Sequence, residues 1–326
     1  MKHITIVVPQ GEGNNLSSIV GSYKIFMRAN AYWKEKTGKT LYKIQVAGQP
    51  SDYYEGLFSV SPHIHFSAIK KTDLIIIPSV NHLYAQAIKM NQPLINWIEQ
   101  QYNKGAEVAS ICTGAFLLAA TGILHGKSCS TNWAVADAFK NLFPDITLQT
   151  DKLITDEDGI YTSGGAYSFL NLIIYLVEKY FDRPTAIYCA KIFQIEMDRQ
   201  SQSPFMIFKG QKEHGDTIVE KAQLFIEKHI DEKISFEQLS NRFAVGRRNF
   251  DRRFIKATGN TPLEYAQRVK IEAAKKELET TRKTINEVMY EVGYSDVKAF
   301  REVFKKVTGI SPLDYRKKYN KEAMAG

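Results

Sequence analysis

Two stretches decide the fold of the last third of this chain: SFEQLSNRFAVGRRNFDRRFIKATGNTPLEYAQRVK, residues 235–270, and TINEVMYEVGYSDVKAFREVFKKVTGISPLDYRKKY, residues 284–319. The second stretch repeats the first. The offset between the copies is 49 residues at their start, where Ser235 matches Thr284, and 50 residues at their end, so one residue is inserted at 295–298. The recurring positions are Phe250, Phe254, Gly259, Pro262, Leu263 and Tyr265, repeated as Phe300, Phe304, Gly309, Pro312, Leu313 and Tyr315.

Each copy predicts a helix, a tight turn and a second helix. A capping-box pattern, Ser235-x-x-Gln238 or Thr284-x-x-Glu287, marks the start of the first helix, because the hydroxyl and the third side chain satisfy amide hydrogens there. We expect the first helices to end near residues 244 and 293, and the second helices to begin near 247 and 296. This arrangement is the DNA-reading unit whose second helix enters the major groove.

The second helix of each copy has an apolar side and a charged side. At 100° per residue, phenylalanines at 250, 254, 300 and 304 point to the core, and basic side chains point away. Arginine can hold guanine O6 and N7, and lysine mostly neutralises phosphates. The alternative is that these charges are only the solvated face of a helical bundle. The predicted outward and flanking positions are Arg247, Arg248, Asn249, Asp251, Arg252, Ile255 and Lys256 in the first copy, and Lys298, Ala299, Arg301, Glu302, Lys305 and Lys306 in the second.

The charge of the chain is concentrated in the same region. The whole chain carries a formal net charge of +8, and residues 211–326 hold 24 Lys and Arg against 18 Asp and Glu. A basic region attracts polyanions such as nucleic acid.

Residues 216–320 resemble the AraC/XylS-type transcription-regulator domain, in which a long helix, here about 263–278, joins two helix-turn-helix units. The resemblance implies that both recognition helices enter successive major grooves of double-stranded DNA, about 34 Å apart. It also implies base-reading positions. These are Arg248, Asp251 and Arg252, then Lys298, Ala299, Arg301 and Glu302.

The first 197 residues predict an α/β domain. Short apolar runs alternate with longer helical patterns, which is typical of a parallel sheet covered on both faces. The expected strands are 4–8, 42–47, 74–77, 108–111 and 160–162, and the expected helices are 17–33, 93–103, 165–181 and 184–197. A polar stretch with Pro204 and Gly210, residues 198–215, is expected to be the linker, and 321–326 a tail. A length of 326 residues suits two domains.

A cysteine lies where the strand 108–111 runs into a helix. Small residues, Ser110 and Gly114, flank Cys112 as glycines flank the serine of a nucleophile elbow, so the backbone can turn sharply there. A helix N-terminus near the sulfur favours thiolate. The geometry suits a nucleophile.

This first domain resembles the PfpI/ThiJ-like branch of the class I glutamine-amidotransferase-like fold, a flavodoxin-like parallel sheet. The resemblance rests on DLIIIP (73–78), SICTGAFLLA (110–119), STNW (130–133) and TSGG (162–165). In enzymes of that family the cysteine works with a histidine and often a glutamate. Here no acidic residue occurs from 13 to 34 unless Glu12 substitutes from the loop, and Asn132 stands where related regulators commonly have histidine.

We therefore expect no catalysis and instead a pocket for an unknown small-molecule effector. Its expected residues are Gly11, Glu12, Cys112, Thr113, Asn132, Trp133 and Gly164. Three alternatives stay open: a cysteine-dependent hydrolase, hydratase or glyoxalase with Cys112 as nucleophile and the helical domain as an accessory, a redox sensor using Cys112, and an inert scaffold.

Other sites are disfavoured, and we expect no cofactor and no metal. His63, His65 and His82 lack accompanying carboxylates, and Leu16 stands where a dinucleotide-binding motif after Gly11 needs its third glycine. Three cysteines without C-x-x-C argue against a disulfide framework and for a reducing compartment. The apolar runs are too short for a signal peptide or a membrane span.

Together these patterns predict a cytoplasmic, two-domain transcription regulator, and it resembles the GlxA-like group. It joins a PfpI-like sensor or dimerisation domain to an AraC-type DNA-binding domain. Its expected partners are double-stranded DNA, RNA polymerase and the effector, and no membrane. The family resemblance also implies a homodimer, that is, a second copy of the chain as partner.

Overall fold

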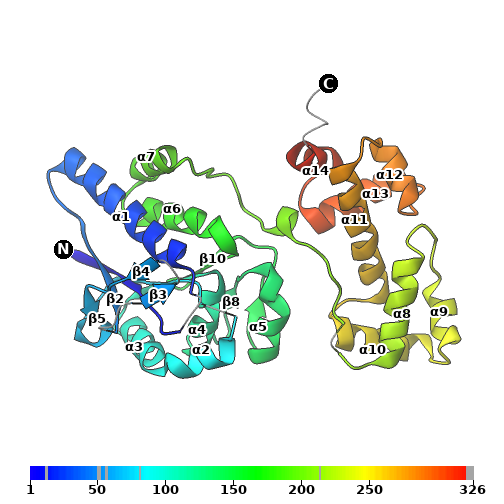
Figure 1. The fold of residues 1–326 in the computed structure, drawn as a ribbon, viewed down its shortest axis with the longest axis horizontal. Helices are drawn as coiled ribbons and strands as arrows, with labels where there is room; N and C mark the ends of the chain where they lie inside the picture. Colours follow the sequence, from blue (N-terminus) through cyan, green and yellow to red (C-terminus); the bar gives the residue numbers. More distant parts are fainter. Residues whose placement is uncertain (12–13, 50–52, 56–57, 81, 213, 321–326) are drawn as a thin grey trace. The chain divides into compact units, whose positions relative to one another are not determined.

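The computed structural model describes residues 1–11, 14–49, 53–55, 58–80, 82–212 and 214–320. Glu12 and the expected tail 321–326 lie outside these residues. The chain divides into two units, Met1–Gln202 and Ser203–Gly326, and the division falls inside the stretch 198–215 that the sequence marks as a linker (Figure 1).

The first unit contains a seven-stranded sheet in the order β10-β11-β7-β6-β1-β2-β5. All neighbouring strands are parallel except β10 and β11, which form an antiparallel hairpin at one edge. The predicted parallel sheet is therefore confirmed. The strands are β1 (Lys2–Val7), β2 (Tyr42–Gly48), β5 (Ile64–His65), β6 (Leu74–Ile77), β7 (Glu107–Ile111), β10 (Ile154–Glu157) and β11 (Ile160–Ser163); β3 (Tyr53–Glu55) pairs with β4 (Phe58–Val60), and β8 (Ser128–Cys129) with β9 (Thr147–Leu148).

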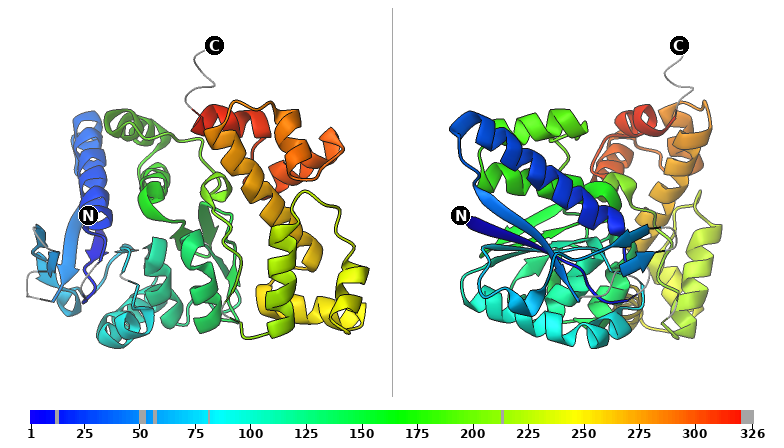
Figure 2. Two further views of the ribbon diagram at one scale, coloured as in Figure 1. Left: turned by 45° about the vertical axis from the view of Figure 1, so that its right-hand side comes forward. Right: turned by 60° about the vertical axis from the view of Figure 1, so that its left-hand side comes forward.

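Helices cover both faces of this sheet (Figures 1 and 2). In β6, Leu74 and Ile76 enter one core and Ile75 and Ile77 enter the other, because successive side chains of a strand point to opposite faces. All four are fully buried. The first core is covered by α1 (Leu16–Thr37), α6 (Phe169–Tyr180) and α7 (Arg183–Phe193), and the second by α2 (Tyr84–Met90), α3 (Gln92–Asn103), α4 (Ala115–Ala120) and α5 (Ala136–Leu142).

The second unit has seven α-helices in its described part, and it holds the predicted pair of helix-turn-helix units. They are α8 (Thr217–Lys228), α9 (Phe236–Arg242), α10 (Arg247–Thr258), α11 (Pro262–Thr280), α12 (Ile285–Glu291), α13 (Val297–Thr308) and α14 (Pro312–Tyr319). The long helix α11 serves both units. Its Tyr265 packs in one core with Phe250 and Phe254, and its Leu278 packs in another with the phenylalanines of α13.

The ends of these helices follow from their capping residues. At α12 the predicted box is complete: the Thr284 amide donates to Glu287 Oε2 at 2.6 Å, and the Glu287 amide donates to Thr284 Oγ1 at 3.2 Å. At α9 only one of the two bonds of the predicted box is formed among the described residues: the Ser235 side chain accepts from the Gln238 amide. A third box that the sequence analysis missed, Thr261 with Glu264, starts α11.

The repeated Gly-x-x-Pro ending also has a structural reason. Gly259 and Gly309 have φ of +68° and +78° and end α10 and α13 in the left-handed region, which glycine adopts without steric cost. The proline three positions later is the first residue of the next helix, where its missing N–H is not needed.

Candidate nucleic-acid interface and sensor site

The outer face of α10 carries exposed basic side chains, as the sequence predicts. Arg248, Asn249, Arg252 and Lys256 are exposed. Phe250 and Phe254 on the opposite side are fully buried. Helix α10 is therefore attached through its apolar side, and its charged side faces solvent in the second unit.

Two predicted positions of α10 are tied to each other. The Arg247 Nε donates to both oxygens of Asp251, at 2.9 and 3.0 Å, and the Arg247 guanidinium lies 5.7 Å from the centre of the Phe236 ring of α9. This pair, four residues apart on the helix, braces the turn between α9 and α10. Arg252 is held more loosely, since its Nη2 donates to Asn249 Oδ1 at 3.0 Å.

A neighbouring arginine, Arg253, is structural. Its guanidinium donates to both oxygens of Asp216, each at 2.8 Å, and Asp216 also caps α8 by accepting from the amides of Ile218 and Val219. These donors, the Arg253 guanidinium first, hold the pKa of the Asp216 carboxyl below its ordinary value. Arg253 therefore fixes α10 to α8.

The outer face of α13 is exposed in the same way. The six positions predicted for DNA contact are all exposed, and Phe300 and Phe304 are fully buried behind them. Asp296 caps the helix by accepting from the Ala299 amide at 2.6 Å. The exposed side chains are Lys298, Ala299, Arg301, Glu302, Lys305 and Lys306.

In the first unit, Cys112 follows β7 directly and is the first residue of the short 3-10 helix η2 (Cys112–Gly114). Its φ of +53° is in the left-handed region, which a residue with a Cβ rarely adopts. Gly114 is required beside it, because a Cβ there would lie 2.6 Å from the carbonyl oxygen of Pro78. The elbow predicted from the sequence is present, and the Cys112 side chain is buried.

Polar residues of the predicted pocket are engaged in contacts of their own. Among the described residues, no histidine or carboxylate donates to or accepts from the Cys112 thiol. The Asn132 side chain is engaged in capping a 3-10 turn, where Oδ1 accepts from the Ala134 amide at 3.0 Å. The Thr113 hydroxyl donates to the carbonyl of Val80 at 2.7 Å.

Tyr84 is a neighbour of Cys112 that the sequence analysis missed. Burial raises the pKa of the Tyr84 hydroxyl to about 12, and the electrostatic interaction with Cys112 adds to the rise. The ring of Tyr84 stacks on Phe116 of α4 at 3.8 Å. An aromatic residue on a separate helix has no local sequence pattern that ties it to the elbow.

Hydrogen bonds bring three of the predicted pocket segments together. Thr131 Oγ1 donates to the Cys112 carbonyl at 2.7 Å, and the Thr131 carbonyl accepts from Gln202 Nε2 at 2.9 Å. Gln202 Oε1 in turn accepts from the Gly165 amide at 2.9 Å. Trp133 is half-buried and Gly164 is buried, and Gly11 has a φ of +118° in the loop after β1.

The histidines considered for metal binding have separate structural roles. His63 Nδ1 accepts from the Val46 amide at 3.0 Å, His65 Nδ1 accepts from the Ser67 amide at 3.2 Å, and His82 Nδ1 lies 2.9 Å from the Tyr84 hydroxyl. No group of three or more His, Cys, Asp or Glu in the described ranges is arranged to hold a metal ion. No helix in the same part of the chain is long and apolar enough to cross a membrane.

Comparison with known proteins assigns each unit to a family. Residues 20–179 match the DJ-1/PfpI family, and residues 239–318 match a family described as a helix-turn-helix domain. The HTH-type transcriptional regulator GbdR of Pseudomonas aeruginosa is 24% identical over 68% of this chain, which spans 60% of the length of GbdR. The regulator GlxA of Rhizobium meliloti is 23% identical over 66% of this chain and 66% of its own length.

Solved structures match the first unit. A protein of Vibrio parahaemolyticus described as a transcriptional regulator is 26% identical, with a TM-score of 0.53 over 59% of this chain and 98% of its own. Drosophila melanogaster DJ-1beta shares the fold, at 16% identity and a TM-score of 0.50 over 60% of this chain and 98% of its own. The chain therefore combines a DJ-1/PfpI-type domain, matched over residues 20–179, with an AraC-type helix-turn-helix domain, matched over residues 239–318.

Proposed function

We propose that this protein is a sequence-specific DNA-binding transcription regulator. The observation that carries the proposal is the duplicated helix-turn-helix unit, whose two second helices have the same length, the same glycine ending and exposed basic outer faces. The relatives named as transcriptional regulators support it.

The two recognition helices would divide the work between base contacts and phosphate contacts. Arg248 and Arg252 would read guanines, because their guanidinium groups project from the exposed face of α10. In α13, Glu302 would accept from a cytosine amino group, and the methyl group of Ala299 would pack against a thymine methyl. The remaining proposed contacts are Arg247, Asn249, Asp251 and Lys256 of α10 and Lys298, Arg301, Lys305 and Lys306 of α13.

The Arg247–Asp251 ion pair adds a refinement. Both Asp251 oxygens accept from one arginine nitrogen, so a base contact by Asp251 would share its carboxylate with Arg247. We propose that the two residues act together, with Arg247 setting the direction of the Asp251 carboxylate.

The first unit is proposed to be a sensor and dimerisation domain in the cytoplasm, acting with RNA polymerase. Its effector, a small molecule of unidentified class, would bind around Cys112, Thr113, Asn132, Trp133 and Gly164 with the loop at Gly11 and Glu12. Asn132, which stands where the resemblance implies histidine and whose amide cannot act as a base, supports a sensing role over catalysis.

One observation favours a second candidate, a cysteine-dependent enzyme. The strained φ of Cys112 is the geometry of a nucleophile elbow. Iodoacetamide labelling decides between them: an enzyme requires Cys112 to react well below pH 8, whereas the sensor proposal expects labelling no faster than that of an ordinary thiol. The redox alternative is tested by peroxide treatment: peroxide sensitivity of DNA binding that survives Cys112→Ser would exclude a redox sensor at Cys112.

The DNA-binding proposal is tested by a gel shift on a duplex that the protein selects from a random pool. The double variant Arg248→Ala, Arg252→Ala should bind at least ten-fold more weakly than the wild type at equal salt, since each bidentate base contact contributes about 1–3 kcal/mol. The control is Lys221→Ala, Lys228→Ala, which removes the same charge from exposed positions of α8. Equal binding by the arginine variant and the wild type would refute the assignment of α10.

A further inference from the structure

The side chain of Gln202 is buried in the first unit and fully engaged there. It is 2% exposed. Its Nε2 lies within hydrogen-bond distance of three carbonyl oxygens, those of Thr131, Thr150 and Lys152, at 2.9, 3.1 and 3.1 Å, and of Ser130 Oγ at 3.3 Å. Its Oε1 accepts from the Gly165 amide. We call this set of partners the Gln202 cradle.

The Gly-Gly pair of the TSGG motif makes room for this cradle. A Cβ on Gly164 would lie 2.2 Å from Gln202 Cδ, and a Cβ on Gly165 would lie 2.4 Å from Asn132 Cγ. Neither distance is sterically allowed. The motif is therefore needed for the Gln202 and Asn132 side chains to pack against the backbone at the start of η4 (Ala166–Ser168).

The cradle is joined directly to the cysteine elbow. Thr131 contributes its carbonyl to Gln202 and its hydroxyl to the carbonyl of Cys112. Ser130, the other side of the cradle, donates its amide to Thr162 Oγ1 of β11 at 2.6 Å. A change at Cys112 that moves Thr131 would therefore alter the bonds that hold Gln202.

Residues immediately after Gln202 are held just as firmly, but by the second unit. The Pro204 carbonyl accepts from the Tyr319 hydroxyl of α14 at 2.9 Å. The Met206 carbonyl accepts from Lys275 Nζ of α11 at 2.6 Å, and Lys275 is itself buried. The turn η5 (Ser203–Phe205) lies against α13, the second recognition helix.

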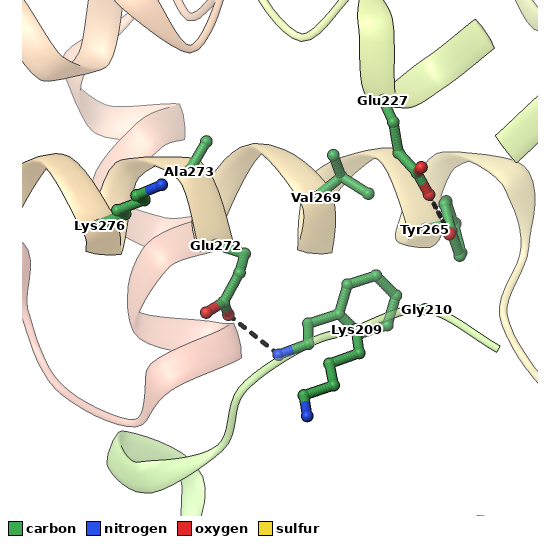
Figure 3. A pocket seen from close by; sticks show the side chains of 9 residues that line it. Lys209, Gly210, Glu227, Tyr265, Val269, Glu272, Ala273 and Lys276 are labelled. Carbon is green, nitrogen blue, oxygen red and sulfur yellow. Dashed lines mark hydrogen bonds between the residues drawn. The ribbon is translucent and has the colours of Figure 1, made fainter. Parts of the chain in front are cut away.

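The attachment continues along α11. The Phe208 amide donates to Glu272 Oε2 at 3.1 Å, and the Phe208 ring packs edge-on to Tyr265 at 5.2 Å. Figure 3 shows this segment beside α11, where Phe208, Lys209 and Gly210 border a cavity of about 240 Å³. Residues 203–208 are thus a strap on the second unit, and Gln202 anchors its start in the first.

We propose that Gln202 is a latch that couples the sensor site around Cys112 to the recognition helix α13. The inference rests on the proposed function. The bonds of Gln202 and those of Pro204 leave only Ser203 between an anchor in one unit and an anchor in the other. An effector that displaces Thr131 opens the cradle, releases Gln202 and loosens the η5 turn against α13, so DNA affinity falls.

The test compares full-length Gln202→Glu with Gln200→Glu. The first variant keeps the shape of the side chain but turns a donor into a carboxylate that faces three carbonyls and a hydroxyl. Gln200 is an exposed neighbour on the same segment, and it takes the same change of charge. Hydrogen–deuterium exchange is measured on peptides covering residues 203–210 and 297–308, followed by the gel shift.

We expect Gln202→Glu to speed exchange at least ten-fold in both peptides and to weaken DNA binding at least about five-fold, the lower end of ordinary allosteric coupling. Gln200→Glu should match the wild type. Faster exchange confined to residues before 203 overturns the latch, whether or not DNA binds. A wild type that selects no duplex refutes the proposed function separately, because the exchange comparison needs no DNA.

Gln202→Ala guards against a folding defect in the glutamate variant. It removes the cradle bonds without placing a charge among carbonyls, and the same increase in exchange is expected at 203–210 and 297–308. Unchanged exchange in both peptides of this variant also overturns the latch.

Discussion

The turn inside each helix-turn-helix unit offers a paired test of how the repeat folds. Ala244 and Gly293 occupy matching positions and both lie in the left-handed region, with φ of +53° and +70°. An alanine there costs about 1–2 kcal/mol, and a glycine costs about 0.5–1 kcal/mol in unfolded-state entropy. Ala244→Gly should therefore stabilise the second unit by about 0.5–1 kcal/mol.

The reverse change at the second turn should be far more harmful. A Cβ on Gly293 would lie 2.5 Å from the carbonyl oxygen of Asp231 and 2.6 Å from Lys270 Nζ. Lysine can move away, but the backbone oxygen cannot do so cheaply. Gly293→Ala should therefore lower the free energy of unfolding of the second unit by about 2–4 kcal/mol, from the left-handed backbone strain and this overlap together.

Urea unfolding followed by two signals separates the units. All three tryptophans, Trp33, Trp97 and Trp133, lie in the first unit, so their fluorescence reports that unit, while circular dichroism reports both. We expect the two variants to shift only the circular-dichroism transition, in opposite directions. Destabilisation by Ala244→Gly as large as that by Gly293→Ala would refute the reasoning.

Three further predictions concern single contacts. The pKa of Asp216 is lower in the folded protein than in the unfolded chain, so its ion pair with Arg253 stabilises the fold above the unfolded carboxyl pKa of about 4. This stabilisation is lost as pH falls through the lower folded pKa. Asp216→Asn should therefore make the free energy of unfolding depend less on pH, as measured by urea titrations between pH 2 and 6. Thr284→Ala removes half of a complete capping box and should cost about 1 kcal/mol in thermal unfolding, and no loss would contradict the cap. Gly164→Ala should expel Gln202 from its cradle and speed amide exchange at Gly165, whereas unchanged exchange there would contradict the close packing.

Much of the fold follows from local pattern. The run Leu74–Ile77 matches β6 residue for residue, because four apolar residues closed by Asp73 and Pro78 suit only a buried strand. The start of α10 at Arg247 follows from the repeat. The helix expected to continue to 197 instead ends at Phe193, since Gln194 adopts a left-handed φ of +54° that no glycine announces.

The parts of the structure that could not be predicted depend on contacts between segments that are distant in the sequence. Strand β10 lies at an edge of the sheet and pairs there only with β11. A strand at an edge needs no continuous run of buried apolar residues, and the mostly polar sequence of β10 has none. Gln202 lies in a stretch that is polar in sequence, and its partners come from residues 37 to 72 positions away. The TSGG motif was the available sign, because adjacent glycines mark places where other groups approach the backbone closely.

The most direct test of the central claim is guanine-methylation protection on a duplex selected by the full-length protein. Two recognition helices in successive major grooves predict two protected patches about 10–11 base pairs apart on one face. Arg248→Ala with Arg252→Ala should remove one patch, and Lys298→Ala with Arg301→Ala should remove the other. A single patch in the wild type, or the same two patches in both variants, would contradict the account.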